Sequence, residues 1–341
     1  MLKGKYIRFV LVIVLMFAVL AGTTSASAAP KNALEVTIAV DKTDYTASDS
    51  VLVNVTFTNI GKNPVKVLKW FTPVEDVEES LFKVTRDGAA VSYTGAIYKR
   101  LAPTGNDYIN LKSGESFTRT VDLGQYYDLS LTGVYEVEYN YDVTALESNK
   151  VQVTVEGRSA PSLTIVPESV TGSTSFNKCT TAQASTLNTA RANASTYASN
   201  SLDYLNAGTQ GLRYTTWFGI YNSARYSTVT SHFSAISNAM DTKPVTFDCS
   251  CKKKNVYAYV YANQPYKIYL CSVFWTAPLT GTDSKAGTLI HEMSHFTVVA
   301  GTTDYVYGQT GAKNLAITNP SQAIMNADNH EYFAENTPTL P

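Results

Sequence analysis

The chain has 341 residues, of which 27 are Lys or Arg and 28 are Asp or Glu, so its formal net charge is −1. This balance excludes the strongly basic surface expected of a nucleic-acid-binding protein, and it also excludes an acidic tail. The one basic run, Lys252–Lys254, is expected to be a solvated turn between strands. The length predicts two domains once an N-terminal leader is set aside.

The first residues have the three parts of a secretory signal peptide. Three basic residues stand within the first eight positions, an apolar run covers Phe9–Ala21, and small residues follow at Ala26–Ala28. The apolar run is shorter than the ~20 residues that a membrane-spanning helix needs. We therefore expect residues 1–28 to be removed, giving an extracellular protein without a stable membrane anchor. A retained signal anchor is the alternative.

Residues 29–158 alternate apolar and polar side chains in short runs separated by turn residues. The clearest runs are Leu34–Val40, Val51–Phe57, Leu81–Thr85 and Gly133–Tyr139. This period of two predicts an all-β domain of the Ig-like sandwich type. The region has no cysteine and no histidine, so we expect no catalytic constellation in it. Residues 159–175, rich in Ser, Thr, Pro and Gly, are expected to form a linker that carries a maturation site.

Residues 176–341 are expected to form a second domain, of the α+β class. Helical spacing covers residues 182–205 and 226–240, and a strand hairpin is expected from 257–261 and 267–270. A further helix is expected to begin after Ser284 as N-cap and to run to about Val299. Residues 321–336 again show a helical pattern.

All four cysteines lie in this second domain. An even number in an exported chain suggests two disulfides. Cys249 and Cys251 are two apart in a strand-like stretch and are unsuitable partners for each other. Spacing alone leaves two pairings open, namely Cys179 with Cys249 and Cys251 with Cys271, or Cys179 with Cys251 and Cys249 with Cys271. A cysteine-based metal cluster is a third possibility.

The segment His291–His295, with the sequence HEMSH, has the spacing of a catalytic zinc motif. Residues four apart share one helix face, so His291 and His295 can direct two imidazoles at one ion. Glu292 then lies beside the metal and can accept a proton from bound water. Asp304, after the chain-reversing Gly301, can return as the third ligand. A surface helix with two unpaired histidines is the alternative. The motif by itself would account for a bound metal, so a cysteine-based metal cluster is not needed to explain one.

Three other side chains need an interpretation. Tyr307 can offer a phenol to a developing oxyanion, or it is one packed aromatic among the 23 tyrosines. His330 as a fourth ligand would close the site to water, so we expect a structural or supporting role for it. His232 is expected to be structural or on the surface.

HEMSH followed by GTTDYVYG at residues 301–308 resembles the aspzincin metallopeptidase pattern HExxH…GTxxDxxYG, in its deuterolysin and peptidyl-Lys metalloendopeptidase branch. The resemblance extends from about Phe176 to the C-terminus, and no motif position departs from it. It implies a zincin-type catalytic domain that binds one Zn²⁺. It further implies the first of the two disulfide pairings. The roles it implies are zinc ligation by His291, His295 and Asp304, general-base catalysis by Glu292 and oxyanion stabilisation by Tyr307.

Asp328 and Glu331 are three residues apart, on one face of the last predicted helix. Two carboxylates can hold an ammonium through charge-assisted hydrogen bonds. In the peptidyl-Lys branch the matching positions form an acidic pocket for lysine, so the resemblance implies cleavage on the N-terminal side of Lys. An exposed helix face or a helix cap is the alternative.

The family includes members that are made with a removable N-terminal propeptide. The resemblance therefore implies that residues 29–158 inhibit the protease until export. A cysteine-based latch on the zinc is excluded, so the inhibition has to come from steric cover or from a segment lying in the cleft. The sequence therefore predicts a secreted, monomeric zinc metalloendopeptidase that acts on proteins and peptides and has its own propeptide as inhibitor. The alternatives are a permanent accessory domain, or an adhesin with a non-catalytic metal site.

Overall fold

The computed structural model describes residues 33–141, 146–157 and 172–341. The expected signal peptide and most of the expected linker therefore lie outside the described residues. Among those described, no helix combines the length and the apolar character needed to cross a bilayer.

The N-terminal region is built from short, mostly antiparallel sheets, and its all-β character matches the alternation in the sequence. In β1 (Leu34–Val40) every second side chain is buried, beginning with Leu34. Both larger sheets contribute to one apolar core, and the Ig-like connectivity stays a prediction. The first sheet has the order β1, β3 (Leu52–Asn59), β9 (Ser116–Asp122). The second has the order β2 (Asp44–Tyr45), β11 (Leu146–Val155), β10 (Gly133–Tyr141), β5 (Phe82–Arg86), β6 (Ala89–Ala90), and a separate pair joins β4 (Val65–Leu68) to β8 (Tyr108–Leu111).

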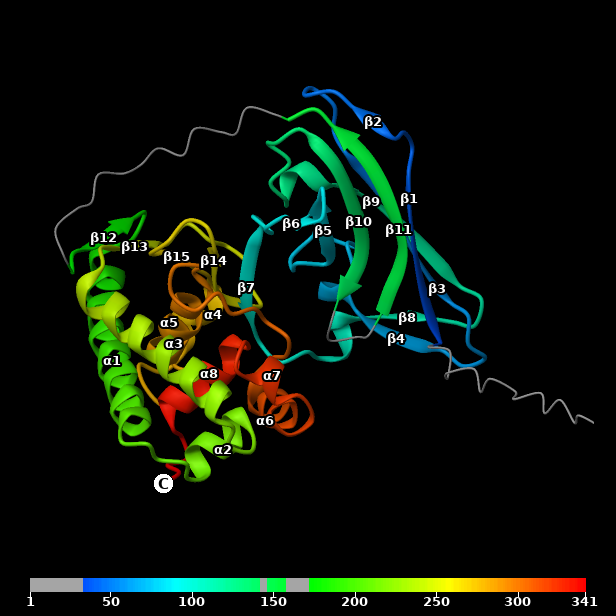
Figure 1. Ribbon diagram of the computed structural model, residues 1–341. Helices are drawn as coiled ribbons and strands as arrows, with labels where there is room; N and C mark the ends of the chain where they lie inside the picture. The colour runs from blue at the N-terminus through cyan, green and yellow to red at the C-terminus, as the bar shows by residue number, and fades with distance from the viewer. Residues whose placement is uncertain (1–32, 142–145, 158–171) are drawn as a thin grey trace, which may run out of the picture. The chain divides into compact units, whose positions relative to one another are not determined.

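One strand of this region leaves the N-terminal sheets. Strand β7 (Ala96–Arg100) is buried at all five positions and pairs antiparallel with β14 (Val256–Tyr261) of the C-terminal region. In this pairing Tyr98 lies opposite Tyr259, and Lys99 lies opposite Ala258. Figure 1 shows β7 beside β14. Burial on both faces is typical of a strand inside a structure rather than of a sheet with one solvated face. The period-two alternation did not predict that this strand would join a sheet of the C-terminal region.

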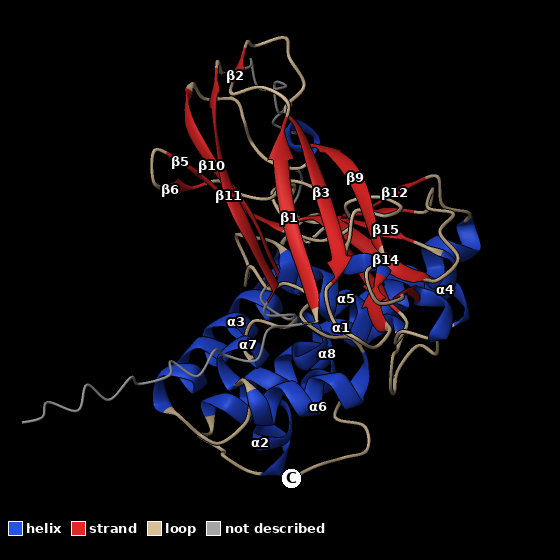
Figure 2. Ribbon diagram, turned by 90° about the vertical axis from the view of Figure 1, so that its right-hand side faces the viewer, coloured by secondary structure: helices blue, strands red, loops and turns tan. Residues whose placement is uncertain are grey.

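The C-terminal region has a five-stranded sheet and a group of helices (Figure 2). Strands β14 and β15 (Lys267–Leu270) form the expected antiparallel pair, and β7 continues the sheet beyond β14. On the other side of β15 come β13 (Val245–Asp248) and β12 (Thr174–Asn177), which pair in parallel. The helices are α1 (Thr181–Asn206), α2 (Leu212–Phe218), α3 (Ser223–Thr242), α4 (Ser272–Thr276), α5 (Lys285–His295), α6 (Gly308–Thr318), α7 (Pro320–Ala323) and α8 (Ala327–Glu335).

The helix boundaries differ from the expectation at two places. Helix α5 begins after Ser284 as predicted, with the Ser284 hydroxyl accepting the Gly287 amide, but it ends at His295 rather than near Val299. It ends there because Phe296 adopts an extended ψ of 129°. The Phe296 carbonyl then accepts the amides of residues 299–301, which form a turn instead of continuing the helix. The predicted helix over residues 321–336 is split into α7 and α8. Helices α2, α4 and α6 had no counterpart in the sequence prediction.

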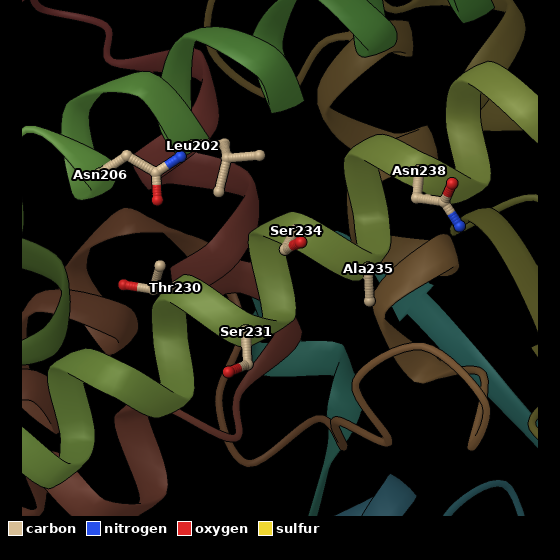
Figure 3. Close-up of a pocket in the computed structure, with 7 residues that line it drawn as sticks. All are labelled: Leu202, Asn206, Thr230, Ser231, Ser234, Ala235 and Asn238. Carbon is tan, nitrogen blue, oxygen red and sulfur yellow. The ribbon is translucent and has the colours of Figure 1, made fainter.

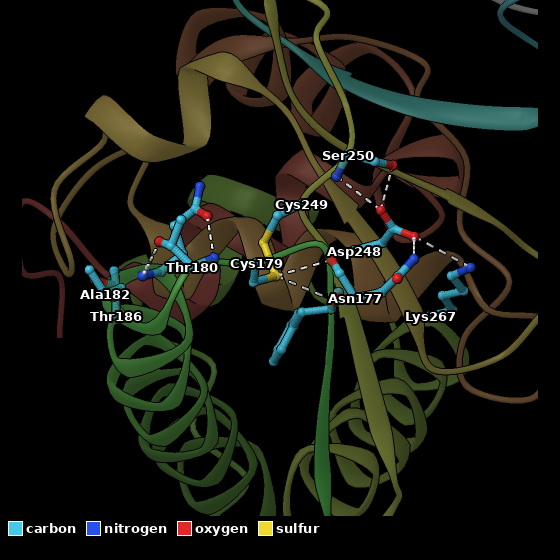
Figure 4. The surroundings of a disulfide bond; sticks show 11 residues. Asn177, Cys179, Thr180, Ala182, Thr186, Asp248, Cys249, Ser250 and Lys267 are labelled. Atoms are coloured by element: carbon cyan, nitrogen blue, oxygen red, sulfur yellow. Dashed lines mark hydrogen bonds and ion pairs between the residues drawn. A yellow bond between two sulfur atoms is a disulfide. The ribbon is translucent and has the colours of Figure 1, made fainter.

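Two disulfides join segments that directly follow strands of the C-terminal sheet. Cys179 is bonded to Cys249, and Cys251 is bonded to Cys271, which is the pairing that the resemblance implied. Around the first bond, the Asp248 carboxylate accepts from an asparagine amide of β12 and from the Ser250 hydroxyl (Figure 4). The swapped pairing and the cysteine-based metal cluster are therefore absent from the structure.

A shallow groove of about 520 Å³ lies between α1 and α3 (Figure 3). None of its residues is among those predicted for the site. They are Leu202, Asn206, Thr230, Ser231, Ser234, Ala235 and Asn238.

Arg191 holds the start of the C-terminal region together. Its guanidinium, on α1, donates to the Met240 carbonyl at 3.0 and 2.9 Å, to the Lys243 carbonyl at 2.8 Å and to the Ser173 carbonyl at 2.9 Å. One buried side chain thus links α1, the end of α3 and the entry to β12. Burial lowers the pKa of Arg191, and the charge of Asp241 offsets only part of this effect.

Arg191→Met should lower the free energy of unfolding by about 3 kcal/mol or more, because several buried carbonyls lose a charged donor. Arg191→Lys should recover only part of this loss, since an ammonium has fewer donors in a different geometry. Denaturant unfolding followed by tryptophan fluorescence measures the change. Arg225→Met is the matched control, because its guanidinium donates to one near-surface carbonyl, that of Ile220. Equal losses in the two Met variants would contradict the role.

Candidate active site

The two histidines of the HEMSH motif and Asp304 come together in the buried interior. His291 Nε2 lies 3.2 Å from Asp304 Oδ1, and His295 Nε2 lies 3.4 Å from Asp304 Oδ2. All three side chains are fully buried. Ligand bonds of about 2.0–2.2 Å in a tetrahedral zinc site separate ligand atoms by about 3.3–3.6 Å. The spacing of these donors therefore fits a zinc ion.

A tight turn after α5 brings Asp304 back to the histidines. The Phe296 carbonyl accepts the amides of Val299, Ala300 and Gly301, and the Thr302 amide returns to the Ser294 carbonyl at 3.1 Å. Gly301 has φ +59°, a conformation that glycine adopts without the steric cost of a side chain. The predicted reversal at Gly301 is thus confirmed, although the helix itself ends six residues earlier.

Partners on the far side of each imidazole set its orientation. His295 Nδ1 lies 2.9 Å from the Thr302 carbonyl, and His291 Nδ1 lies 2.9 Å from Asp328 Oδ1. His295 Nδ1 thus donates to a carbonyl and His291 Nδ1 faces a carboxylate, so Nε2 of each ring is left for a metal. Burial raises the pKa of the Asp304 carboxyl, but the two imidazoles outweigh burial and lower it overall, so Asp304 is an anionic donor.

Glu292 is a buried acid for which the described residues supply no hydrogen-bond partner to either carboxylate oxygen. Burial raises its pKa to about 8. An unpaired buried carboxyl is costly unless another group, such as water at a metal, completes its hydrogen bonding. This arrangement suits a proton acceptor beside a metal site.

Tyr307 precedes α6 and points its hydroxyl toward the metal-site residues. The phenol oxygen lies 2.5 Å from Glu79 Oε1, 2.9 Å from the Tyr98 carbonyl oxygen and 3.4 Å from Asp304 Oδ2. Its ring packs edge-on against Trp70, with 5.4 Å between ring centroids. Tyr307 is therefore a packed aromatic residue, and its hydroxyl also lies within reach of the metal-site residue Asp304.

Asp328 and Glu331, on α8, form an acidic pocket that holds a cation of the same chain. The Lys99 ammonium, from β7, lies 2.5 Å from Glu331 Oε2 and 3.4 Å from Asp328 Oδ1. All three side chains are at most 1% exposed. Burial lowers the pKa of Lys99, but the two carboxylates outweigh it and raise the pKa well above the usual range. The alternative of an exposed helix face is wrong.

Three residues of this pocket were missed by the sequence analysis. Asp283 Oδ1 lies 3.9 Å from the Lys99 ammonium, and the Tyr257 ring centroid lies 4.8 Å from it. The Tyr332 ring is 6.0 Å away, and its hydroxyl donates to Asp283 at 2.7 Å. Tyr332 follows Glu331 directly and could have been suspected. The other two come from distant segments with no motif.

Glu335 was also missed, although it fixes α8 against α5. Its Oε1 accepts from the Ser284 amide and from the Ser284 hydroxyl, both at 2.8 Å. Burial, followed by the nearby Glu331, raises the pKa of Glu335 to about 9. Gly287 is required here, because a Cβ at that position would meet Glu335 Oε1 at 2.1 Å. The predicted cap residue is thus tied to the helix that carries the acidic pocket.

The two remaining histidines contact each other rather than the metal-site donors. His232 Nδ1 lies 3.0 Å from His330 Nε2, and His330 Nδ1 lies 3.0 Å from the Asn326 carbonyl. Burial lowers the pKa of His330 to about 3, which keeps it neutral. Its packing against Phe218 and Phe233 fits the structural role expected from the sequence.

Comparisons with known proteins agree with this geometry. Residues 203–335 match the family model described as lysine-specific metallo-endopeptidase. The chain is 47% identical over 313 residues to an extracellular protease of Aeromonas hydrophila, covering 86% of this chain and 90% of that protein. It is 37% identical over 345 residues to a peptidyl-Lys metalloendopeptidase of Armillaria mellea, covering 95% and 97%. A peptidyl-Lys metalloendopeptidase of Pleurotus ostreatus is 53% identical over 166 residues, which cover 98% of that protein but 48% of this chain.

Similarity at this level extends over most of the chain and of its relatives, not over the motif alone. The chain also has two buried imidazoles and a buried carboxylate at the spacing of zinc ligands. Glu292, next to His291 in the same helix, is a buried acid without a hydrogen-bond partner among the described residues. On these grounds the chain belongs to the aspzincin family of zinc metalloendopeptidases.

Proposed function

We propose that this chain is the secreted proenzyme of a zinc metalloendopeptidase that cleaves peptide bonds on the N-terminal side of Lys. The observation that carries the proposal is the position of Lys99. Its ammonium lies between buried carboxylates, while the carbonyl of the preceding residue, Tyr98, lies 2.9 Å from the Tyr307 hydroxyl. A substrate with Lys directly after the cut bond would fill the site in the same way.

The catalytic roles follow from the chemistry of the side chains. His291, His295 and Asp304 are the proposed zinc ligands, and zinc, when bound, supplies Lewis-acid polarisation of the carbonyl and a more acidic water. Glu292, with its raised pKa, accepts the proton of the attacking water and passes it to the leaving amine. Tyr307 donates its phenolic hydrogen to the oxygen of the tetrahedral intermediate.

The pocket favours Lys for physical reasons. Asp328 and Glu331 are buried, so losing their cation would leave uncompensated charge in the interior. The rings of Tyr257 and Tyr332 add cation–π attraction at 4.8 and 6.0 Å. A compact ammonium suits such a closed pocket better than the broad, planar guanidinium of Arg. A substrate lying antiparallel to β14, as β7 does, would bring the bond before its Lys toward Tyr307.

Several observations support the proenzyme assignment for residues 29–158, followed by a linker at 159–175 and a catalytic domain at 176–341. Strand β7 occupies the position proposed for substrate. Beside it, Glu78 is paired with both Arg100 and Lys253. Lys252 and Lys254 are exposed, as expected of a solvated turn, while Lys253 between them contacts the N-terminal region. The relative from Pleurotus ostreatus is matched almost completely by about half of this chain, which fits a separable catalytic part. Export is supported by the signal-peptide pattern of residues 1–28 and by the similarity to a relative named extracellular protease.

In the processed enzyme, Glu292→Ala should retain one zinc and lower turnover by about 10²–10⁴-fold, because it removes only the proton acceptor. Asp304→Ala should instead lose zinc, since a ligand is removed. Metal analysis with a peptide-cleavage assay measures both effects, and a chelator should abolish wild-type cleavage. Near-normal turnover by zinc-loaded Glu292→Ala would contradict the base role. Zinc binding without chelator-sensitive proteolysis would favour the binding-protein alternative.

Glu331→Gln should lower the rate of cleavage before Lys relative to cleavage at neutral sites by at least tenfold. The reason is that a charge-assisted hydrogen bond is worth about 1.5–3 kcal/mol, which only the Lys substrate loses. Matched peptides that differ at the residue after the cut bond give the ratio within one enzyme sample. Any general damage cancels in that ratio. Equal wild-type rates before Lys and before neutral residues would contradict the pocket.

Separately expressed residues 29–157 should inhibit the processed enzyme in trans, because they carry β7 and Lys99. Lys99→Ala should weaken this inhibition at least tenfold, since the pocket carboxylates lose their cation. Lys150→Ala is the matched control, because Lys150 is exposed and pairs with Glu136 within the N-terminal region. A titration of inhibitor against peptide cleavage gives the inhibition constants. Equal inhibition by all three proteins would contradict the role of Lys99.

A further inference from the structure

The peptide bond between Tyr98 and Lys99 is held as a substrate would be, which raises the question of what keeps it uncut. Strand β7 runs antiparallel to β14, the Lys99 side chain fills the acidic pocket, and the Tyr98 carbonyl lies 2.9 Å from the Tyr307 hydroxyl. By the specificity proposed above, on which this inference rests, the enzyme should cut at this bond. Occupation of the site alone does not explain its survival.

The N-terminal region leaves a space close to this site. A cavity of about 530 Å³ is lined by Ser80, Tyr93 and Ile97 of that region and by His295 and Thr302 of the C-terminal region. The side chains of the metal-site residues are themselves fully buried.

Glu79 is the N-terminal residue that interferes with the chemistry. It is 1% exposed, and its Oε1 lies 2.5 Å from the Tyr307 hydroxyl, closer than the Tyr98 carbonyl at 2.9 Å. A phenol has one hydrogen to donate, so a hydrogen bond to Glu79 removes it from the carbonyl.

The chain around Glu79 is held on both sides, so its position is not accidental. The preceding residue, Glu78, pairs with Arg100 of β7 and with Lys253 of the C-terminal region. The Glu79 carbonyl accepts the amide of Leu81, which is fully buried, at 2.8 Å. Glu79 is thus anchored to the strand whose bond it would protect.

We propose that Glu79 keeps the Tyr98–Lys99 bond intact in the proenzyme by engaging the Tyr307 hydroxyl, and that release of Glu79 turns β7 from an inhibitor into a substrate. In the released state one water adds to the Tyr98 carbonyl carbon while the bond to the Lys99 nitrogen breaks. The water proton passes through Glu292 to that nitrogen. The products are a carboxylate on Tyr98 and a free amine on Lys99, so the cut divides the inhibitory strand.

The test uses the full-length, zinc-loaded proenzyme. Glu79→Ala should be cut between Tyr98 and Lys99 at least tenfold faster than wild type, giving a fragment that begins at Lys99. Intact-mass spectrometry and N-terminal sequencing identify the fragment. The rate should not depend on protein concentration, because the bond is already in the site. Glu79→Gln, whose amide oxygen can still accept a weaker hydrogen bond from the phenol, should be cut at an intermediate rate and serves if the Ala variant misfolds.

The controls separate this inference from the function on which it rests. Glu79→Ala combined with Glu292→Ala should stay intact, and Glu75→Ala, at an exposed surface pair, should behave as wild type. Folded Glu79 variants that stay uncut, although the processed enzyme cuts peptides before Lys, would overturn the role of Glu79. A cut that appears only at high concentration would overturn it as well. A processed enzyme that does not cut before Lys would instead overturn the proposed specificity.

Discussion

The burial of the Lys99 ammonium against Asp328 and Glu331 is the interaction on which the rest of the site depends. Both carboxylates also lie close to His291 Nδ1, at 2.9 and 3.4 Å, so the pocket and the metal-site donors share their charges. Carboxylates without a cation are unfavourable in a buried site, and the chain supplies one from its own N-terminal region. In the proposed function, inhibition and specificity therefore have one physical origin, which is the need of this pocket for an ammonium.

Helix α8 places both halves of the site at once. Asp328 and Glu331 face His291, and Glu335, one turn further, caps the start of α5 through Ser284. The Asp328 carboxylate also accepts the Gly308 amide at 2.6 Å, next to Tyr307. A shift of α8 would therefore move the acidic pocket, the metal-binding helix and the phenol together. Such mutual support is what holds catalytic groups in a productive geometry.

The sequence was informative where structure and chemistry are local. The Ser284 cap, the helical spacing of the histidines and the reversal at Gly301 depend on neighbouring residues, and the described structure contains all three. Strand β7 was not identified because alternation marks a strand but not its partner. Glu79 was missed for a related reason, since a lone acid in a β region has no pattern and matters only through contact with a phenol 228 positions away. The family resemblance predicted the acidic pocket of Asp328 and Glu331, but not that Lys99 fills it.

The pairing of β7 with β14 has a consequence for the proposed processed form of the enzyme. Within the described residues, β7 is the outermost strand of the C-terminal sheet, and its loss would leave β14 as an edge with unpaired backbone groups. That edge carries Tyr257, Tyr259 and Tyr261, and aromatic residues favour strand pairing. An open, aromatic edge binds extended peptides by strand addition, but it also invites two enzyme molecules to join. A protease that bound substrate through this edge would therefore risk self-association, and in the described structure β7 covers the edge.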